Sequence, residues 1–284
     1  MFEDVRKLAN IGSSAHYTLG VGVHNAVTAS LVGRAGFDVL WLSSLEISTA
    51  KLLPDANVIT FNEVSDILRE IKRTTTLPIM VDADNGYGSD ETAIRAAQEF
   101  CAAGATAICL EDNAFPKRNS FYVGIDRNLE DIEIFCQRIK KVRQRVDPSL
   151  EIIARTEGLV AGRGAKETIE RAYAYIEAGA DALFVQSGKF TKEDFEKVLS
   201  EIKGYVPIIT TPTALPEVSA ERLHAMGVDI IIFSNVVMRT IIKSVSEVLS
   251  TLLYKQNFGG VQDRMLPLED LFEITHAYDW FDMT

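Results

Sequence analysis

Hydrophobic residues along this chain fall into short runs that are apolar at nearly every position, and amphipathic stretches separate them. Four stretches combine the end of a helical pattern, a small residue, a glycine and an apolar run, at 34–43, 102–111, 177–186 and 225–234. Four more apolar runs lie at 17–23, 78–84, 151–157 and 207–213. The runs have the length of strands, and a glycine after a helix suits the left-handed C′ position. The pattern predicts eight strands, each followed by a helix.

Strands that are apolar on both faces and alternate with helices indicate a parallel sheet covered by helices. Eight such units in roughly 250 residues are typical of a (β/α)8 TIM barrel. An open, doubly wound sheet is the alternative, but no G-x-G-x-x-G follows the first strand. No linker or break in composition divides the chain, so we expect one domain over residues 1–284. Residues 267–275 are expected to form an extra helix after the barrel.

Composition and charge narrow the functional classes. The net charge of −11 argues against nucleic-acid binding, which needs a basic face. Residues 1–14 lack the apolar core of a signal peptide, and the longest apolar run, 228–238, has about half the length that spans a bilayer. We therefore expect a soluble, cytoplasmic protein that binds neither nucleic acid nor membrane.

Cysteine and histidine offer no candidate chemistry. The three cysteines show no metal-binding spacing and are expected to be reduced core thiols: Cys101, Cys109 and Cys136. The four histidines form no catalytic triad, and we interpret each as structural: His16, His24, His224 and His276.

The ends of the predicted strands carry the polar residues from which a barrel builds its active site. The third strand ends in Asp82 and Asp84, which are two residues apart, so both are expected to point into the barrel mouth. The fourth strand ends in Glu111. Converging carboxylates repel one another unless a cation lies among them, and oxygen ligands without histidine or cysteine favour Mg²⁺. The alternative, that such acids cap the following helices, is our interpretation for Asp90 and Glu91.

Other residues near strand ends offer groups for an anion. Arg155 ends the fifth strand and can hold an anion, form an ion pair with Glu157, or do both. Ser43 and Ser44 follow the second strand, where hydroxyls and backbone amides could bind a carboxylate or phosphate, although Ser-Ser is also ordinary turn chemistry. Asp112 points away from the residue before it by strand alternation, so its role stays open between structural and functional.

The segment 110–120, LEDNAFPKRNS, is interpreted as a loop that passes over the mouth of the barrel. Lys117 and Arg118 can neutralise an anionic substrate, and Asn119 and Ser120 can donate hydrogen bonds. Mobile loops of this kind exclude water from barrel active sites. A solvated basic loop is the alternative.

Four motifs resemble, in order and spacing, the phosphoenolpyruvate mutase branch of the isocitrate lyase superfamily: VDADNGYG, LEDNAFPKRNS, IIARTEGLVAGRG and EAGADALFVQS. The resemblance covers nearly the whole chain. It implies a (β/α)8 barrel whose final helix is swapped between subunits, a homodimer or homotetramer, and Mg²⁺ in the site. The lyase and oxaloacetate hydrolase branches carry Cys-Gly in the loop after the fourth strand, whereas this chain has Asn119-Ser120, as the mutases do.

The resemblance implies a role for each candidate residue by position. The metal would be held directly by Asp82 and through water by Asp84 and Glu111. The substrate carboxylate would meet the hydroxyl and backbone donors of Ser43, Ser44 and Leu45. The phosphoryl group would face Asp55 and be held or covered by Lys117, Asn119, Ser120 and Arg155.

Two positions depart from the mutase pattern. The family has lysine directly after the Glu-Asp of the fourth strand, where this chain has Asn113. It has histidine at the end of the sixth strand, where this chain has Gln186, which can donate a hydrogen bond to the substrate but carries no charge. A phosphonate-like substrate is still expected, while its exact identity stays open.

The leading interpretation is an isomerase of phosphonate biosynthesis that interconverts phosphoenolpyruvate and phosphonopyruvate by phosphoryl transfer within one molecule. Its partners would be a phosphorylated 2-oxo or enol acid and, because phosphonopyruvate formation is uphill, a downstream enzyme that consumes the product. The alternatives are a phosphonopyruvate hydrolase, a C–C lyase of a 2-oxo or 2-hydroxy acid, and a catalytically silent barrel. Asn119 argues against hydrolysis because the hydrolases carry threonine there, and the intact acid cluster argues against a silent barrel.

Overall fold

The structure is a computed structural model, and it describes residues 17–188 and 192–281. Contacts divide the chain into two compact units, Met1–Val236 and Val237–Thr284. The expectation of one domain over residues 1–284 stays a prediction. Among the described residues, no helix is both long enough and apolar enough to cross a membrane.

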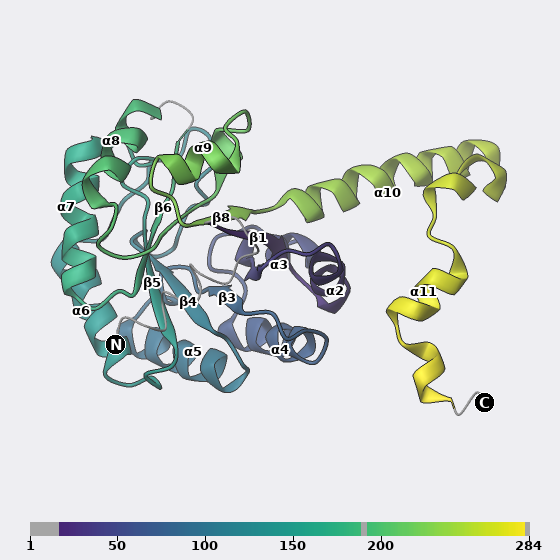
Figure 1. Cartoon of the computed structure of the whole chain (residues 1–284), viewed down its shortest axis with the longest axis horizontal. Coiled ribbons are helices and arrows are strands. Elements are labelled where there is room, and N and C mark those ends of the chain that lie inside the picture. Colours follow the sequence, from purple (N-terminus) through teal and green to yellow (C-terminus); the bar gives the residue numbers. More distant parts are fainter. Residues whose placement is uncertain (1–16, 189–191, 282–284) are drawn as a thin grey trace. The chain divides into compact units, whose positions relative to one another are not determined.

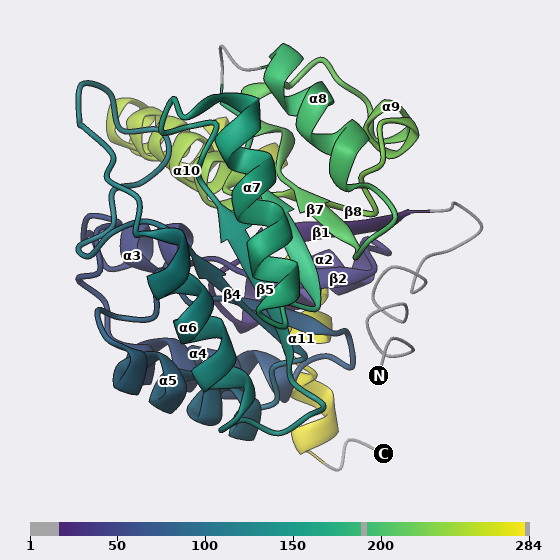
Figure 2. The same cartoon turned by 90° about the vertical axis from the view of Figure 1, so that its left-hand side faces the viewer.

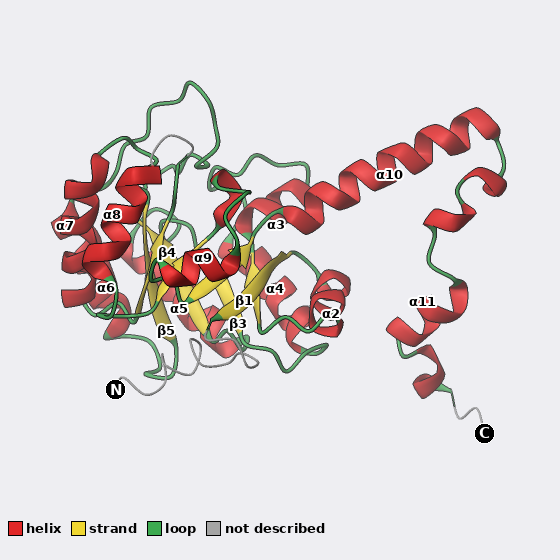
Figure 3. Ribbon diagram, turned by 45° about the horizontal axis from the view of Figure 1, so that its top comes forward, coloured by secondary structure: helices red, strands yellow, loops and turns green. Residues whose placement is uncertain are grey.

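The first unit is a closed barrel of parallel strands that follow one another in sequence order, with the last strand paired to the first. The strands are β1 (Thr18–Val23), β2 (Val39–Leu42), β3 (Ile79–Asp82), β4 (Ala107–Glu111), β5 (Glu151–Thr156), β6 (Ala182–Val185), β7 (Ile208–Thr210) and β8 (Ile230–Phe233). Figures 2 and 3 show the strands enclosed by helices. The predicted (β/α)8 barrel is confirmed, and every strand lies within a predicted stretch.

Helices connect the strands on the outside of the barrel (Figure 1). They are α2 (Ala26–Arg34), α3 (Ser44–Ala50), α4 (Phe61–Lys72), α5 (Asp90–Ala102), α6 (Ile132–Arg143), α7 (Gly164–Glu177), α8 (Lys192–Ile202) and α9 (Ala220–Ala225), with the short 3₁₀ helix η1 (Pro212–Ala214) after β7. Helix α4 illustrates how the local sequence sets where a helix begins and which face it buries. Thr60 caps its first turn reciprocally with Glu63, and Val64, Leu68 and Ile71 form its buried face.

Four of these helices end in a left-handed glycine, as the sequence predicted. Gly36, Gly104, Gly179 and Gly227 have φ values of +85°, +97°, +103° and +106°. Each follows the C-cap residue of its helix, namely of α2, α5, α7 and α9. Glycine adopts this conformation without the steric cost of a Cβ atom, so the chain can reverse direction and enter the next strand.

Side chains from alternate strand positions fill the interior of the barrel. They include Val39, Trp41, Met80, Ala107, Cys109, Ile153, Ala182, Phe184, Ile209, Ile230 and Ile232. A barrel filled in this way is a packed core, so a binding site can form only at an end. Cys109 is a core thiol as expected, but Cys101 and Cys136 are only half-buried, since they lie on the outer helices.

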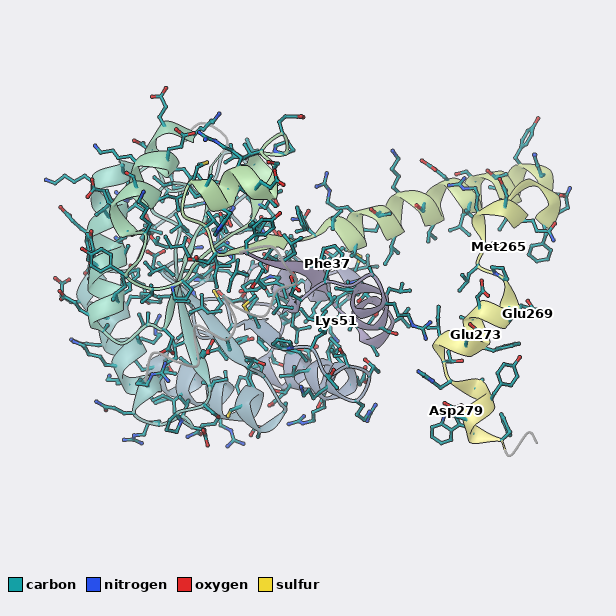
Figure 4. All side chains as sticks on the ribbon, viewed as in Figure 1. Phe37, Lys51, Met265, Glu269, Glu273 and Asp279 are labelled. Carbon is teal, nitrogen blue, oxygen red and sulfur yellow. The ribbon has the colours of Figure 1, made fainter. Side chains whose placement is uncertain are left out.

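The second unit is helical. Helix α10 (Val236–Lys255) leads into it, and η2 (Phe258–Gly260), η3 (Gln262–Arg264), α11 (Leu268–Ile274) and η4 (Ala277–Trp280) follow. Helix α11 confirms the extra helix predicted at residues 267–275. Figure 4 labels Glu269 and Glu273 on α11, and the same short helix exposes the apolar residues Leu268, Leu271 and Phe272.

Candidate active site

A pocket of about 500 Å³, open to solvent, lies where the barrel strands end. Strands β2 to β5 and the segments that follow them supply most of the charged and hydrogen-bonding residues that line it: Ser43, Leu45, Asp55, Asp82, Glu111, Lys117, Asn119, Ser120 and Arg155. The segments after β6, β7 and β8 contribute Gln186, Thr211, Ser234 and Asn235, and three aromatic residues, Trp41, Phe121 and Phe184, complete the lining. The structure thus brings all the predicted site residues except Ser44 and Asp84 to one pocket, while their roles stay predictions.

Ser44 and Asp84 are fully buried beside the pocket. Asp84 was expected to point into the mouth by strand alternation, and its carboxylate does face the acid cluster there, where it pairs with Lys117. Strand β3 ends at Asp82, and Asp84 has a left-handed backbone with φ +50°, so the alternation of a strand no longer applies to it.

The ammonium group of Lys117 lies among the carboxylates. Its Nζ is 2.9 Å from Asp55 Oδ1 and 3.0 Å from Ser44 Oγ, and it also pairs with Asp84. Lys117 is 3% exposed although it comes from a surface loop. Its charge therefore neutralises acids of this chain directly, at a position that also lines the pocket.

The hydroxyl of Ser44 joins two of the carboxylates. Ser44 Oγ lies 2.9 Å from Asp82 Oδ2 and 3.5 Å from Asp55 Oδ1. Because a hydroxyl carries a single proton, the shorter contact is the stronger hydrogen bond, and Ser44 donates to Asp82. The other Asp82 oxygen accepts the backbone N–H of Asp84 at 3.3 Å.

Arg155 forms the second cationic centre of the pocket. It makes the predicted ion pair with Glu157 at 2.5 Å, and its Nε lies 3.5 Å from Glu111 Oε2. It also donates to Ser120 Oγ at 2.9 Å, and Ser120 in turn donates to the other oxygen of Glu157 at 2.7 Å. The ring of Phe184 supports the guanidinium at 5.1 Å. Arg155 is therefore oriented on several sides where it lines the pocket.

The electrostatic balance of the site is negative. Among its described residues, the carboxylates of Asp55, Asp82, Asp84, Glu111 and Glu157 face the two cations Lys117 and Arg155, an excess of three negative charges when all are ionised. Burial raises the pKa of Asp84 to about 6 despite Lys117, and it raises the pKa of Glu111 to about 8 despite Lys117 and Arg155. Burial also opposes ionisation of Asp55, but the charge of Lys117 and the Asn119 hydrogen bond lower its pKa overall.

These residues fit Mg²⁺ in donor type and charge. All the carboxylates are hard oxygen donors, and the excess negative charge suits a divalent cation. Among the described residues, no three His, Cys, Asp or Glu side chains lie close enough together to hold a metal ion. Mg²⁺ commonly binds through one or two carboxylates and several waters, so the predicted direct contact by Asp82 alone does not require such a group.

The loop between β4 and α6 reaches the pocket from a paired base. At the base, Glu130 N donates to Asp112 O at 2.9 Å, and Ala114 N donates to Asn128 O at 2.9 Å. Beyond it, Asn119 Nδ2 donates to Asp55 Oδ2 at 2.6 Å. Tyr122 and Ser120 add further contacts to Asp55 N and Glu157. The loop is therefore held both at Asp55 and at Glu157, on two sides of the site.

Arg118 does not take the role expected for it. Its guanidinium donates to the backbone carbonyls of Pro116 and Lys117, both at 3.2 Å, and it does not line the pocket. Local backbone bonds hold its side chain, so Lys117 is the loop cation that enters the site.

Sequence reasoning missed the neutral side of the pocket. Thr211 Oγ1 lies 2.8 Å from Thr213 Oγ1 and 3.0 Å from Ser234 Oγ, and Asn235 follows Ser234. These residues come after β7 and β8, where the apolar runs give way to TPT and SN. That change in polarity was the available signal, but small uncharged residues are also common in turns. Gln186 lies on the same side and donates weakly to Ser187 O at 3.3 Å.

Two residues of the fourth-strand motif have local partners. Asn113 Nδ2 donates to Glu111 Oε1 at 3.0 Å, so the residue that replaces the family lysine contacts the acid cluster without adding charge. Asp112 is fully buried, and it accepts the N–H of Glu157 and the hydroxyl of Tyr175, each at 2.8 Å. Asp112 therefore has a structural role that links β4 to β5 and α7.

The remaining acids and histidines lie outside the pocket. Ser89, not Asp90 or Glu91, caps helix α5, and the two acids lie in its first turn. His24 contacts Glu46 at 2.9 Å, and His224 contacts the Val228 carbonyl at 2.9 Å. His276 lies after α11, where it pairs with Asp279 at 3.2 Å, and His16 lies outside the described residues.

Comparison with known proteins agrees with this geometry. The family model described as phosphoenolpyruvate phosphomutase matches residues 10–253. A phosphoenolpyruvate phosphomutase of Streptomyces hygroscopicus is 33% identical over 255 residues, which are 89% of this chain and 81% of that protein. A phosphonopyruvate hydrolase of Variovorax sp. (strain Pal2) is 32% identical over 256 residues, 89% of this chain and 87% of that protein. A 2-methylisocitrate lyase of Halalkalibacterium halodurans is 32% identical over 266 residues, 92% and 85% of the two chains.

Solved structures show the same fold. The crystal structure of phosphoenolpyruvate phosphomutase from Streptomyces platensis subsp. rosaceus superimposes with a TM-score of 0.92 at 31% identity, covering 98% of this chain and 96% of that one. A phosphonopyruvate hydrolase in complex with oxalate and Mg²⁺ superimposes with a TM-score of 0.88 at 29% identity, with the same coverage. Similarity to mutases, hydrolases and lyases indicates an enzyme without fixing its reaction. The chain belongs to the phosphoenolpyruvate phosphomutase family.

Proposed function

We propose that this enzyme is a phosphoenolpyruvate mutase, an isomerase that interconverts phosphoenolpyruvate and phosphonopyruvate. The observation that carries the proposal is the position of Asp55 at the pocket wall. Its two carboxylate oxygens are held by Lys117 at 2.9 Å and Asn119 at 2.6 Å, and both partners come from the loop that reaches over the site. An anionic phosphoryl group bound there would lie between a carboxylate and loop donors.

The substrate carboxylate is assigned to the start of helix α3. Ser43 caps this helix and accepts the N–H of Glu46 at 3.3 Å, which leaves the hydroxyl proton of Ser43 free to donate to a ligand. Leu45 lines the pocket beside it. The pyruvate portion would thus be oriented by donors that the fold already holds in place.

Asp82 would hold Mg²⁺, with Asp84 and Glu111 in contact through water. When bound, the metal supplies positive charge for the carboxylate and enolate oxygens of the substrate. Displacement of Lys117 is not required for this role, because the acid cluster has negative charge that the two cations leave uncompensated.

In the proposed reaction, the P–O bond of phosphoenolpyruvate breaks and a P–C bond forms at C3 of the same molecule. Phosphoryl transfer of this type depends on positioning and charge neutralisation more than on a strong nucleophile. Arg155 and Lys117 would neutralise the phosphoryl oxygens, and Asp55 would capture the group or hold it in place. Asn119 and Ser120 would keep water out, because water would convert transfer into hydrolysis.

A C–C lyase that acts on a 2-oxo or 2-hydroxy acid is the second candidate. The neutral side of the pocket favours it, because Gln186, Thr211 and Ser234 offer hydrogen bonds without a positive charge. Such a surface suits a carboxylate or hydroxyl better than a dianionic phosphonate. A phosphonopyruvate hydrolase is less favoured, because Asn119 rather than threonine contacts Asp55.

Phosphorus NMR separates these reactions in one experiment. The protein is incubated with Mg²⁺ and phosphonopyruvate, and the products are followed over time. A mutase converts the phosphonate signal into that of phosphoenolpyruvate without free phosphate, whereas a hydrolase releases phosphate. If phosphate is the main product, the protein is a hydrolase and the mutase proposal is wrong. If phosphonopyruvate does not react, the lyase is favoured.

We also propose a cytoplasmic homodimer or homotetramer in which the C-terminal helices are swapped between subunits. Exposed apolar residues on α11 support it, since they need a partner surface. Because formation of phosphonopyruvate is uphill, the forward reaction needs a downstream enzyme that consumes this product.

A further inference from the structure

Arg127 braces the tip of the loop between β4 and α6. Its Nη2 donates to two backbone carbonyls, those of Asn119 at 2.9 Å and Tyr122 at 2.8 Å. Arg127 itself is adjacent to the paired base of the loop, because the next residue, Asn128, accepts the N–H of Ala114. The guanidinium therefore spans the loop from its base to the residues that contact the active site.

The two carbonyls belong to a single tight turn. Tyr122 N donates to Asn119 O at 3.0 Å, and Phe121 N donates to the side-chain Oδ1 of Asn119 at 3.0 Å. The bond from Phe121 fixes the orientation of the Asn119 amide, because it occupies the amide oxygen. The Nδ2 atom is thereby left to donate to Asp55 at 2.6 Å. The shape of the turn decides where this donor lies.

We propose that Arg127 is a positioning residue that holds the 119–122 turn in shape, so that Asn119 and Ser120 lie over the reacting group. This inference rests on the proposed mutase function. Arg127 touches neither the acids nor the pocket and acts through the loop backbone alone.

The chemistry of arginine suits this bracing role. A guanidinium is planar and permanently charged, so it can serve two carbonyl acceptors from a fixed orientation. The Arg127 side chain is half-buried, and its Nε is buried without a hydrogen-bond partner among the described residues. A surface arginine with no such contacts would extend into water, where every N–H is solvated. The side chain is therefore oriented by the two carbonyls.

Loss of the brace should let the turn change shape without removing any catalytic group. Water would then reach the phosphoryl group in a fraction of turnovers, and these turnovers would release phosphate. The ratio of phosphate to phosphoenolpyruvate formed from phosphonopyruvate reports this leak. It does not depend on the concentration of folded enzyme, so a general loss of stability leaves it unchanged.

The test compares wild type, Arg127→Gln and Arg127→Lys with the matched control Arg118→Gln. Arg118 also donates to loop carbonyls, but only to those one and two residues before it, so its removal leaves the turn intact. Two quantities are measured: the product ratio by phosphorus NMR, and hydrogen–deuterium exchange of peptides that cover residues 113–131. Thermal melting verifies that each variant is folded, and the lysine variant, which can still reach one carbonyl, serves if the glutamine variant is not.

We expect Arg127→Gln to raise the exchange rate of the turn about tenfold, as for loss of a hydrogen bond to a charged group. We also expect it to release phosphate together with phosphoenolpyruvate, whereas wild type releases none. Arg127→Lys should give intermediate values, and Arg118→Gln should resemble wild type. Unchanged exchange in Arg127→Gln overturns the proposal. So does faster exchange with an unchanged product ratio, because the brace would then have no bearing on the reaction.

Failure of the mutase proposal gives a different result. Wild type would then form no phosphoenolpyruvate from phosphonopyruvate, and the exchange measurement alone would decide the role of Arg127. Faster exchange in Arg127→Gln but not in Arg118→Gln would support the brace, and equal exchange in all variants would refute it.

Discussion

His24 Nδ1 lies 2.9 Å from a carboxylate oxygen of Glu46, and both side chains are buried. The second oxygen of Glu46 accepts the backbone N–H of Asn235 at 3.0 Å. His24 follows β1, Glu46 lies in α3 and Asn235 follows β8. One carboxylate therefore links the first and last strands of the barrel to α3, the helix that Ser43 caps.

Substitution of Glu46 by leucine should lower the free energy of unfolding by about 3–5 kcal/mol, because it leaves His24 and the backbone N–H of Asn235 buried without their hydrogen-bond acceptor. Glu46→Gln should cost less, since an amide oxygen can still accept from Asn235. Glu193→Leu, at an exposed position of α8, should change stability by less than about 0.5 kcal/mol. Urea denaturation measures all three, and equal stabilities of Glu46→Leu and wild type would contradict the structural role.

Removal of the metal should abolish activity. A chelator should inactivate the enzyme, and added Mg²⁺ or Mn²⁺ should restore turnover. Asp82→Ala should be folded but inactive, and calorimetric titration should show weaker Mg²⁺ binding than in wild type, because the direct ligand is lost. Full activity in the presence of chelator would remove the metal role assigned to Asp82.

Substitutions of Gln186 test the neutral side of the pocket. Gln186→His should keep at least partial mutase activity, since histidine can still donate a hydrogen bond. Gln186→Leu should lower kcat/KM, with a loss of transition-state stabilisation of about 1–3 kcal/mol. This is the effect of leaving a buried polar group of the substrate unpaired. Steady-state kinetics with phosphonopyruvate measure the difference, and wild-type rates in Gln186→Leu would mean that this residue does not touch the substrate.

Asp90 should stabilise the fold in a pH-dependent way. Burial raises its pKa, but the hydrogen bonds and charges of Lys141 and Arg138 outweigh this and hold the pKa below its usual value of 3.8. An acid whose pKa is lower in the folded state contributes stability above its unfolded pKa and loses it as pH falls through the folded value.

Asp90→Asn should therefore melt at a lower temperature than wild type at neutral pH, and the difference should shrink below about pH 4. Thermal melts of both proteins across this range provide the measurement. A difference that is constant with pH would show that the contribution of Asp90 is not electrostatic.

The C-terminal helices should hold subunits together. Helix α11 exposes Leu268, Leu271 and Phe272, at 63%, 43% and 40% of their surfaces. Sedimentation should show a dimer or tetramer, and deletion of the residues after Leu266 should shift it towards monomer and lower the melting temperature. Glu269→Gln, on the same helix, should leave the assembly unchanged. A stable monomer of the full chain at micromolar concentration would exclude the swapped arrangement.

The barrel and much of its acidic side could be predicted because they depend on local patterns. Glycine at C′, as at Gly104, sets where each helix stops, and the polar residue that ends a buried run, as at Glu111, must emerge at the strand terminus. In a closed parallel barrel these termini share one end, so their neighbours in space follow from the order of the strands.

Other parts of the site depend on geometry that no local pattern records. Asp84 leaves the strand in a left-handed conformation, so its burial beneath Lys117 does not follow from strand alternation. Lys117 enters the acid cluster through a loop path that its basic surroundings in sequence do not reveal. Thr211, Ser234 and Asn235 carry no charge, and only the closure of β8 onto β1 brings them to the pocket.

Residues 112–114 pair with residues 128–130 at the base of the β4–α6 loop, so the segment between them can be replaced as a unit. Its two ends are held side by side by backbone hydrogen bonds that do not depend on the residues between them. Doubling the length of a flexible loop costs only about 0.6 kcal/mol in closure entropy, so insertions within residues 115–127 would lower the stability of the barrel little. Evolution within the family can therefore exchange the groups that cover the mouth of the barrel while the strands beneath keep their register. The same exchange can be made by grafting the segment from a relative.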